Sequence, residues 1–194
     1  MDNEETDTSA PLRYAYKPSL MGGMWEFELG PQALVWRAGR RHGRWPYGTI
    51  AKIRLSYRPQ SIQNHAFRAD ITNAGGERIA LMSTTWQGIA VLAPQNETYR
   101  AFLTSLHGHL AQESRARFIT GMARPLYVAG MAMLGALALA MAGLLARALM
   151  SGVYIGALFL VGFAALFMWQ SGTYMRRNRP GEYSPRALPP YLLP

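Results

Sequence analysis

Two charge-free apolar runs constrain the fold of this chain more than any other feature. The first, PLYVAGMAMLGALALAMAGLLA, covers residues 125–146, and the second, GVYIGALFLVGFAALFMWQ, covers residues 152–170. At about 1.5 Å per residue, helices of these lengths span roughly 30 Å, the thickness of the hydrocarbon core of a bilayer. Two buried helices of a soluble protein are the alternative, but soluble cores rarely hold two successive runs of this kind. Residues 125–170 are therefore predicted to form a transmembrane helical hairpin.

Arginines flank this predicted hairpin unevenly, with six outside it and one, Arg147, in its connection. The six are Arg115, Arg117, Arg124, Arg176, Arg177 and Arg179. Basic residues near membrane spans concentrate on the cytoplasmic side. We therefore predict a protein with two spans whose termini are both cytoplasmic.

Neither run contains Asp, Glu, Lys or His. Since proton paths and ion sites in membranes are built from such groups, the hairpin is predicted to be an anchor rather than a transporter. Small residues recur at a spacing of four, as Ala132, Ala136 and Ala140 in the first run and as Gly152 and Gly156 in the second. Such residues let helices approach closely, either within the hairpin or against another membrane protein.

The residues before the hairpin have a soluble character. Residues 1–11 hold four of the eleven acids and no apolar periodicity, which predicts a disordered acidic tail. Residues 24–86 alternate apolar and polar side chains, as in Trp25, Phe27 and Leu29 against Glu26 and Glu28. This period of two is typical of strands with one buried face and one wet face. Arg54, Arg58 and Arg68 fall on the wet faces.

After Pro94 the period changes to that of a helix. Apolar side chains at helical spacing predict an amphipathic helix that closes one end of a curved sheet and runs nearly to Gly121. These side chains are Tyr99, Phe102, Leu103, Leu106 and Leu110. We take residues 12–120 as one cytoplasmic domain.

One stretch of the domain carries a family resemblance. A predicted strand near FEL is followed by Gly-Pro and then by ALVWRAGRRHGRWPYGTIAKIRLSYRP. This order of elements resembles that of a bacterial PH-like domain. The resemblance also rests on the spacing of Gly43, Trp45-Pro46, Ile50 and Ile53. The resemblance covers roughly residues 20–118. It implies an α+β domain, a PH-like β-barrel or sandwich capped by a C-terminal helix, in a protein of the bacterial cytoplasmic (inner) membrane. It also implies that the domain binds lipids, peptides or protein surfaces.

The segment WRAGRRHGRW concentrates basic residues around a predicted hairpin loop with Gly39 and Gly43. Arg37, Arg40, Arg41 and Arg44 are its candidate binding residues. Three interpretations of this segment remain open. It binds an anionic lipid, it binds an acidic surface of a partner or of the chain's own tail, or it is a solvated loop without a ligand. No platform of stacking aromatic residues accompanies the charge, so nucleic acid is not expected. The PH resemblance implies that phosphoinositide sites lie in such a loop.

No pattern in the sequence indicates catalysis or metal binding. There is no cysteine, and His107 and His109 are two positions apart on the predicted helix, so they point about 200° apart. No phosphate-binding glycine loop occurs, and the acids past the tail show no paired spacing for general acid–base catalysis. We therefore expect no cofactor, no metal and no enzymatic activity.

The C-terminal residues 171–194 are basic and proline-rich, which predicts an extended tail. Its apolar end, Tyr191, Leu192 and Leu193, is either part of a disordered tail or docks on the domain or on a partner. Two functions follow as hypotheses: a membrane-anchored, non-enzymatic binding module for anionic lipid or a membrane-proximal ligand, or an accessory or assembly subunit of a larger membrane complex. An unrecognised enzyme is a third.

Overall fold

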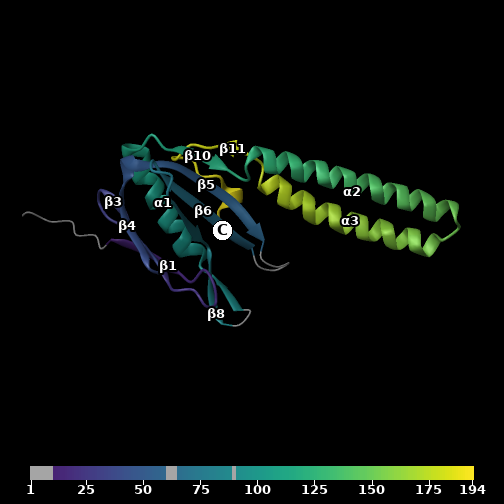
Figure 1. Cartoon of the computed structure of the whole chain (residues 1–194), viewed down its shortest axis with the longest axis horizontal. Coiled ribbons are helices and arrows are strands. Elements are labelled where there is room, and N and C mark those ends of the chain that lie inside the picture. The colour runs from purple at the N-terminus through teal and green to yellow at the C-terminus, as the bar shows by residue number, and fades with distance from the viewer. Residues whose placement is uncertain (1–10, 60–64, 89–90) are drawn as a thin grey trace, which may run out of the picture. The chain divides into compact units, whose positions relative to one another are not determined.

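The computed structural model describes residues 11–59, 65–88 and 91–194, and it divides into two compact units (Figure 1). The first unit, the domain, comprises residues 1–118 and 183–194, and the second, the hairpin unit, comprises residues 119–182. The predicted acidic tail, residues 1–11, lies outside the described residues except for Pro11. The domain is thus assembled from two separate stretches of the chain.

The first sheet of the domain is an antiparallel meander in the order β1-β2-β3-β4. Its strands are β1 (Leu12–Tyr16), β2 (Trp25–Leu29), β3 (Ala33–Ala38) and β4 (Arg41–Pro46). Alternation puts Tyr14, Phe27 and Trp36 in one register row on the buried face. The opposite face is exposed and charged, as the period of two predicted.

The second sheet is built on β5 (Ile50–Pro59), β6 (His65–Asn73) and β7 (Arg78–Met82), which follow the short 3-10 turn η1 (Tyr47–Thr49). Ile53, Ile71 and Ile79 share one register row and are fully buried. A separate hairpin joins β8 (Thr84–Gly88) to β9 (Val91–Pro94).

The helix α1 (Asn96–Glu113) supplies the remaining core of the domain. The apolar side chains predicted for its buried face are all buried, together with His107. The prediction that this helix runs nearly to Gly121 is wrong. The helix ends at Glu113, and Ser114 after it has extended backbone. Strand β10 (Arg117–Thr120) follows, with Phe118 buried beside His107.

The expected mixed α+β class is confirmed, but the described strands form separate sheets rather than a closed barrel. Strands β1 and β7 are joined by hydrogen bonds from side chains rather than by hydrogen bonds between their backbones. The hydroxyl of Tyr16 donates to the carbonyl of Ala80 over 2.7 Å, and that of Tyr14 donates to the carbonyl of Met82. A hydroxyl at the end of a long side chain holds two strand edges farther apart than a direct ladder would.

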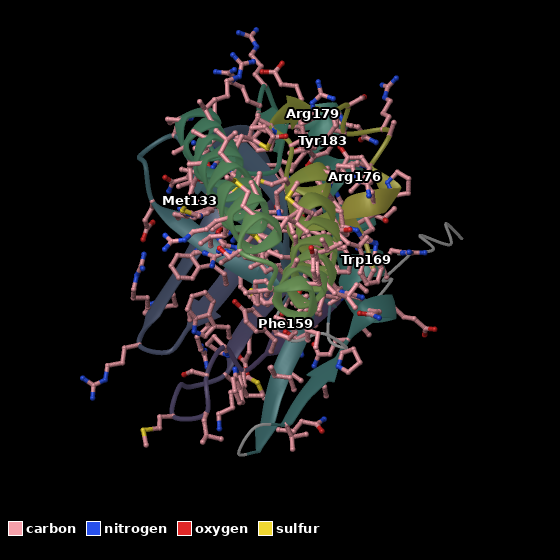
Figure 2. The ribbon with its side chains drawn as sticks, turned by 90° about the vertical axis from the view of Figure 1, so that its right-hand side faces the viewer. Met133, Phe159, Trp169, Arg176, Arg179 and Tyr183 are labelled. Atoms are coloured by element: carbon pink, nitrogen blue, oxygen red, sulfur yellow. The ribbon has the colours of Figure 1, made fainter. Side chains whose placement is uncertain are left out.

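The hairpin unit contains α2 (Arg124–Met150) and α3 (Tyr154–Arg177), side by side in Figure 1. Both helices are long and apolar enough to cross a membrane. Their mutual contact uses a narrow stripe, and most of their large apolar side chains are exposed. Figure 2 shows Met133 on the α2 side and Trp169 on the α3 side, and these are 69% and 72% exposed.

The chain segments that enter and leave the helices of the hairpin unit pair with each other, and we call this paired region the neck. Ile119 and Thr120 of β10 pair with Glu182 and Gly181 of β11 (Gly181–Glu182). Next to this pair, Gly121 has a φ of +68°, and a Cβ on it would lie 2.2 Å from the carbonyl oxygen of Asn178. A side chain at this position is therefore excluded both by the left-handed backbone and by the space.

Candidate functional site

The predicted basic cluster lies on the hairpin of β3 and β4, whose connection is only Gly39 and Arg40. Gly39 has a φ of +64°, a left-handed conformation that glycine adopts without a steric cost. The turn exposes Arg40 to solvent. Strand β4 is the last strand of the first sheet, so among the described residues it pairs with β3 alone in that sheet.

The alternation of a strand divides the four arginines between two faces. Arg37 and Arg44 lie on the exposed face of the sheet, together with His42. Arg41 lies in the row of Ala38, on the other face. The four predicted binding residues therefore do not form one patch.

Arg41 is engaged within the domain. Its guanidinium lies 2.7 Å from the carboxylate of Glu77, in the turn between β6 and β7, and 5.6 Å from the centre of the Trp36 ring. A salt bridge between exposed side chains contributes little stability, but it orients this arginine toward the second sheet. Arg68, expected on a wet strand face, is likewise engaged: it and Arg78 bind the buried carboxylate of Asp70 at 2.8 and 2.6 Å.

Gly43 is not part of the loop that the sequence suggested, but lies inside β4. It faces Trp36, and a Cβ on it would lie 3.0 Å from the indole ring. The ring of Trp36 also packs edge to face on Trp45, with centroids 5.4 Å apart. The two tryptophans that bracket the basic segment are thus core residues, 2% and 5% exposed.

The exposed face of the first sheet forms a shallow groove of about 610 Å³. Its polar lining includes Arg13, Glu26, Glu28, Arg37, His42 and Arg44. Arg13 binds Glu28 at 2.9 Å, whereas no ion pair within 4.0 Å involves Arg37, Arg40 or Arg44 among the described residues. We call Arg37, Arg40 and Arg44 the basic edge; Glu26 lies opposite Arg37 in the strand register and lines the same groove.

The groups with shifted pKa values lie elsewhere, in the core. Burial raises the pKa values of Tyr14, Tyr16 and Tyr99, and it raises the pKa of Tyr47 to about 12. Burial also lowers the pKa of His107 to about 4. These shifts follow from burial in the core. Tyr14, Tyr16, Tyr47 and His107 each donate to a backbone carbonyl, whereas the buried hydroxyl of Tyr99 has no hydrogen-bond partner among the described residues.

The two histidines of α1 have different surroundings. The Nδ1 of His107 donates to the carbonyl of Leu103 over 2.7 Å, so its Nε2 accepts a hydrogen bond from the hydroxyl of Tyr183 over 2.8 Å. His109 stacks on Tyr47, with ring centroids 4.7 Å apart. In the part of the chain that the structure describes, no three His, Cys, Asp or Glu side chains come together as a metal site.

The predicted alanine stripe of α2 is not at the contact between the two helices. Ala132, Ala136 and Ala140 are exposed. The partly covered residues of α2 instead recur at spacings of three and four, as expected for a coiled-coil seam. They are Tyr127, Gly130, Leu134, Ala138, Met141, Leu145 and Ala148.

The second predicted small-residue motif also differs from expectation. Gly152 lies in the connection between the helices with a φ of +72°, so it and Gly156 do not form a motif on one helix face. The reason is local: the chain reverses at Gly152, and glycine accepts the left-handed backbone that the reversal uses.

The apolar C-terminal residues belong to the domain unit. Leu192, in the single turn η2 (Pro190–Leu192), is 1% exposed, Tyr191 is 48% exposed and Leu193 is half-buried. Sequence reasoning missed Tyr183, which contacts both His107 and Phe118. An aromatic residue within a polar, proline-rich tail was the available signal.

No family model, curated protein or solved structure matches this chain.

Proposed function

We propose that this protein is a membrane-anchored, non-enzymatic binding module of PH-like architecture at the cytoplasmic face of a bacterial inner membrane. Its basic edge engages the headgroup of an anionic phospholipid. The observation that carries the proposal is the hairpin of β3 and β4. Arg37 of β3 and Arg44 of β4 lie on the exposed face of the sheet and Arg40 lies in the turn, and none of the three has an ion-pair partner among the described residues.

The anchor is the pair α2 and α3, which have the length and composition of spans. Connectivity supports the same side of the membrane for both of their outer ends. Phe118 precedes the hairpin unit and Tyr183 follows it, and the backbone N–H of Tyr183 donates to the carbonyl of Phe118 over 3.1 Å. Because both ends of the hairpin lead into the same folded domain, the hairpin begins and ends on the same side of the membrane as that domain. The arginine bias supports the cytoplasm as that side.

Electrostatics gives the expected size of the lipid interaction. A basic side chain near an anionic leaflet contributes about 1 kcal/mol, so loss of Arg37 and Arg44 should weaken binding by about 2 kcal/mol, roughly thirty-fold. Because the anchor already holds the domain at the membrane, this interaction serves to select an anionic lipid and to orient the domain, rather than to recruit the protein to the membrane.

The test uses the full chain in neutral detergent and two short-chain lipids, a phosphatidylglycerol and a phosphatidylcholine, titrated below their micelle concentrations. We expect salt-sensitive binding of the phosphatidylglycerol, weakened at least several-fold in Arg37→Gln/Arg44→Gln. The matched control, Lys52→Gln/Arg58→Gln, removes the same charge from β5 and should bind as the wild type does. Equal affinity for both lipids, or equal loss in both double variants, would refute the proposal.

A second candidate, an accessory subunit of a membrane complex, rests on the exposed stripe of Ala132, Ala136 and Ala140. Because this stripe lies outside the contact with α3, it is free to receive a helix of another protein at close range. Purification of the full chain in mild detergent, followed by mass spectrometry, tests it. A stoichiometric membrane partner should be lost in Ala136→Trp and retained in Leu137→Trp; retention in both variants would rule out this surface.

A further inference from the structure

The last twelve residues, Tyr183–Pro194, belong to the same compact unit as residues 1–118, although the hairpin unit lies between them in the chain. The hairpin is therefore an insertion into the domain, and the domain is completed only by residues that follow both apolar helices. We call residues 183–194 the C-terminal latch.

The first anchor of the latch is Tyr183, which is labelled in Figure 2. Its backbone N–H donates to the carbonyl of Phe118 over 3.1 Å, and its hydroxyl donates to Nε2 of His107 over 2.8 Å. Its ring packs edge to face on Phe118, with centroids 5.6 Å apart. One residue thus combines a backbone bond, a buried side-chain bond and an aromatic contact.

The second anchor is the other end of the latch. Leu192 is 1% exposed, Pro189 is buried, and the turn η2 that carries Leu192 contacts β5. The guanidinium of Arg100 on α1 donates to the carbonyl oxygen of Pro194. The latch is therefore held at both ends by elements of the domain, α1 and β5.

Between these anchors the latch resembles a bound peptide rather than an element of the sheet. Ser184, Arg186 and Ala187 are exposed, and the backbone N–H groups of Ala187, Leu192 and Leu193 donate to carbonyls within the latch itself. Its prolines at 185, 189, 190 and 194 restrict the free segment, so less conformational entropy is lost on docking.

We propose that the latch is a separable peptide ligand of the domain, and that α1, β5 and Phe118 form a docking site for a segment that starts with tyrosine and ends in Leu-Leu-Pro. The occupant is the chain's own C-terminus, bound in cis. This docking joins the two ends of the hairpin on one side of the membrane. The site is distinct from the basic edge, so it stands or falls independently of lipid binding.

The test uses a chain truncated after Glu182, in neutral detergent, and a fluorescent synthetic peptide of residues 183–194. We expect the peptide to bind the truncated chain and to bind the full chain at least ten-fold more weakly, because the resident latch occupies the site. A peptide with Leu192→Asp should lose at least ten-fold in affinity. Its control, Ala187→Asp, places the same charge at an exposed position and should bind normally.

A companion measurement covers the case in which the truncated chain does not fold. The full chain carrying Leu192→Asp or Ala187→Asp is compared by hydrogen exchange. Leu192→Asp should increase exchange in β5, which the turn η2 contacts, and in the latch itself, while strands β1 to β4 stay protected, and Ala187→Asp should match the wild type. Equal exchange in both variants, or peptide binding that is the same for full and truncated chains, would overturn the proposal.

Discussion

The hydroxyl of Tyr183 donates a hydrogen bond to Nε2 of His107, 76 positions earlier in the chain, over 2.8 Å. This bond joins the segment after the apolar helices to the middle of α1. It also fixes the protonation of His107, since Nε2 accepts only while the imidazole is neutral. The cluster of His107, Tyr183 and Phe118 therefore connects the folding of the domain to pH.

Acidification should destabilise the domain through His107. Burial lowers the pKa of His107 from 6.5 to about 4, so between these values the unfolded state binds the proton and the folded state does not. The free energy of unfolding should therefore be unaffected by His107 above pH 6.5 and fall as the pH decreases, by roughly 3 kcal/mol at pH 4. Denaturation of the full chain in neutral detergent at several pH values measures this. If His107→Gln loses as much stability as the wild type over this range, the effect belongs to other groups.

The carboxylate of Asp70 should be important for stability, although its partners are arginines at the surface. Asp70 is 4% exposed and binds both Arg68 and Arg78. Arg68→Ala/Arg78→Ala leaves this buried carboxylate without its partners, and we expect a loss of about 3 kcal/mol in the free energy of unfolding. Glu28→Ala breaks the exposed pair with Arg13 and should cost less than about 1 kcal/mol. Losses of equal size would show that burial of the carboxylate is not the cause.

Gly43 should not tolerate a side chain, although it lies in a basic and exposed segment. A Cβ would lie 3.0 Å from the ring of Trp36, which is enclosed by the core. Gly43→Ala should therefore lower the free energy of unfolding by about 1–2 kcal/mol and alter tryptophan fluorescence. Gly88→Ala in β8, where a Cβ meets no atom within 4 Å, is the control and should be nearly neutral. If Gly43→Ala leaves the free energy of unfolding unchanged, the ring of Trp36 can shift to make room for the methyl group.

Gly121 should be the least replaceable glycine of the hairpin unit. Its φ is +68° and a Cβ would lie 2.2 Å from the carbonyl of Asn178, so Gly121→Ala opens the neck and should cost at least about 2 kcal/mol. Gly135→Ala, inside α2 with open space around it, should be neutral or slightly stabilising. Thermal unfolding of both variants in detergent separates these outcomes. Similar melting temperatures would contradict the tight neck.

Much of the fold could be predicted because its signals are local. The periods of two in Trp25–Leu29 and of 3.6 around Tyr99 and Leu103 follow from the geometry of strands and helices, and the two apolar runs follow from the length of a span. The end of α1 was missed because Phe118 lies in a strand whose burial depends on His107 and Tyr183. No local pattern carries that information.

The candidate site was only partly predictable for the same reason. The sequence identified the basic segment by itself, and alternation separates Arg37 and Arg44 from Arg41 once the strand register is known. It did not indicate that Arg41 meets Glu77, or that Arg68 is bound by Asp70. These pairs are set by the packing of the sheets, which brings distant charges together.

The sequence by itself determined the two apolar helices, the strand and helix periods and the concentration of arginine, because each depends on neighbours within a few residues. Only the tertiary structure decided which arginines are left without partners, and that the domain is completed by the residues after the hairpin. Those outcomes depend on contacts such as Tyr183 with His107, whose formation costs chain entropy and is compensated by burial in the assembled core.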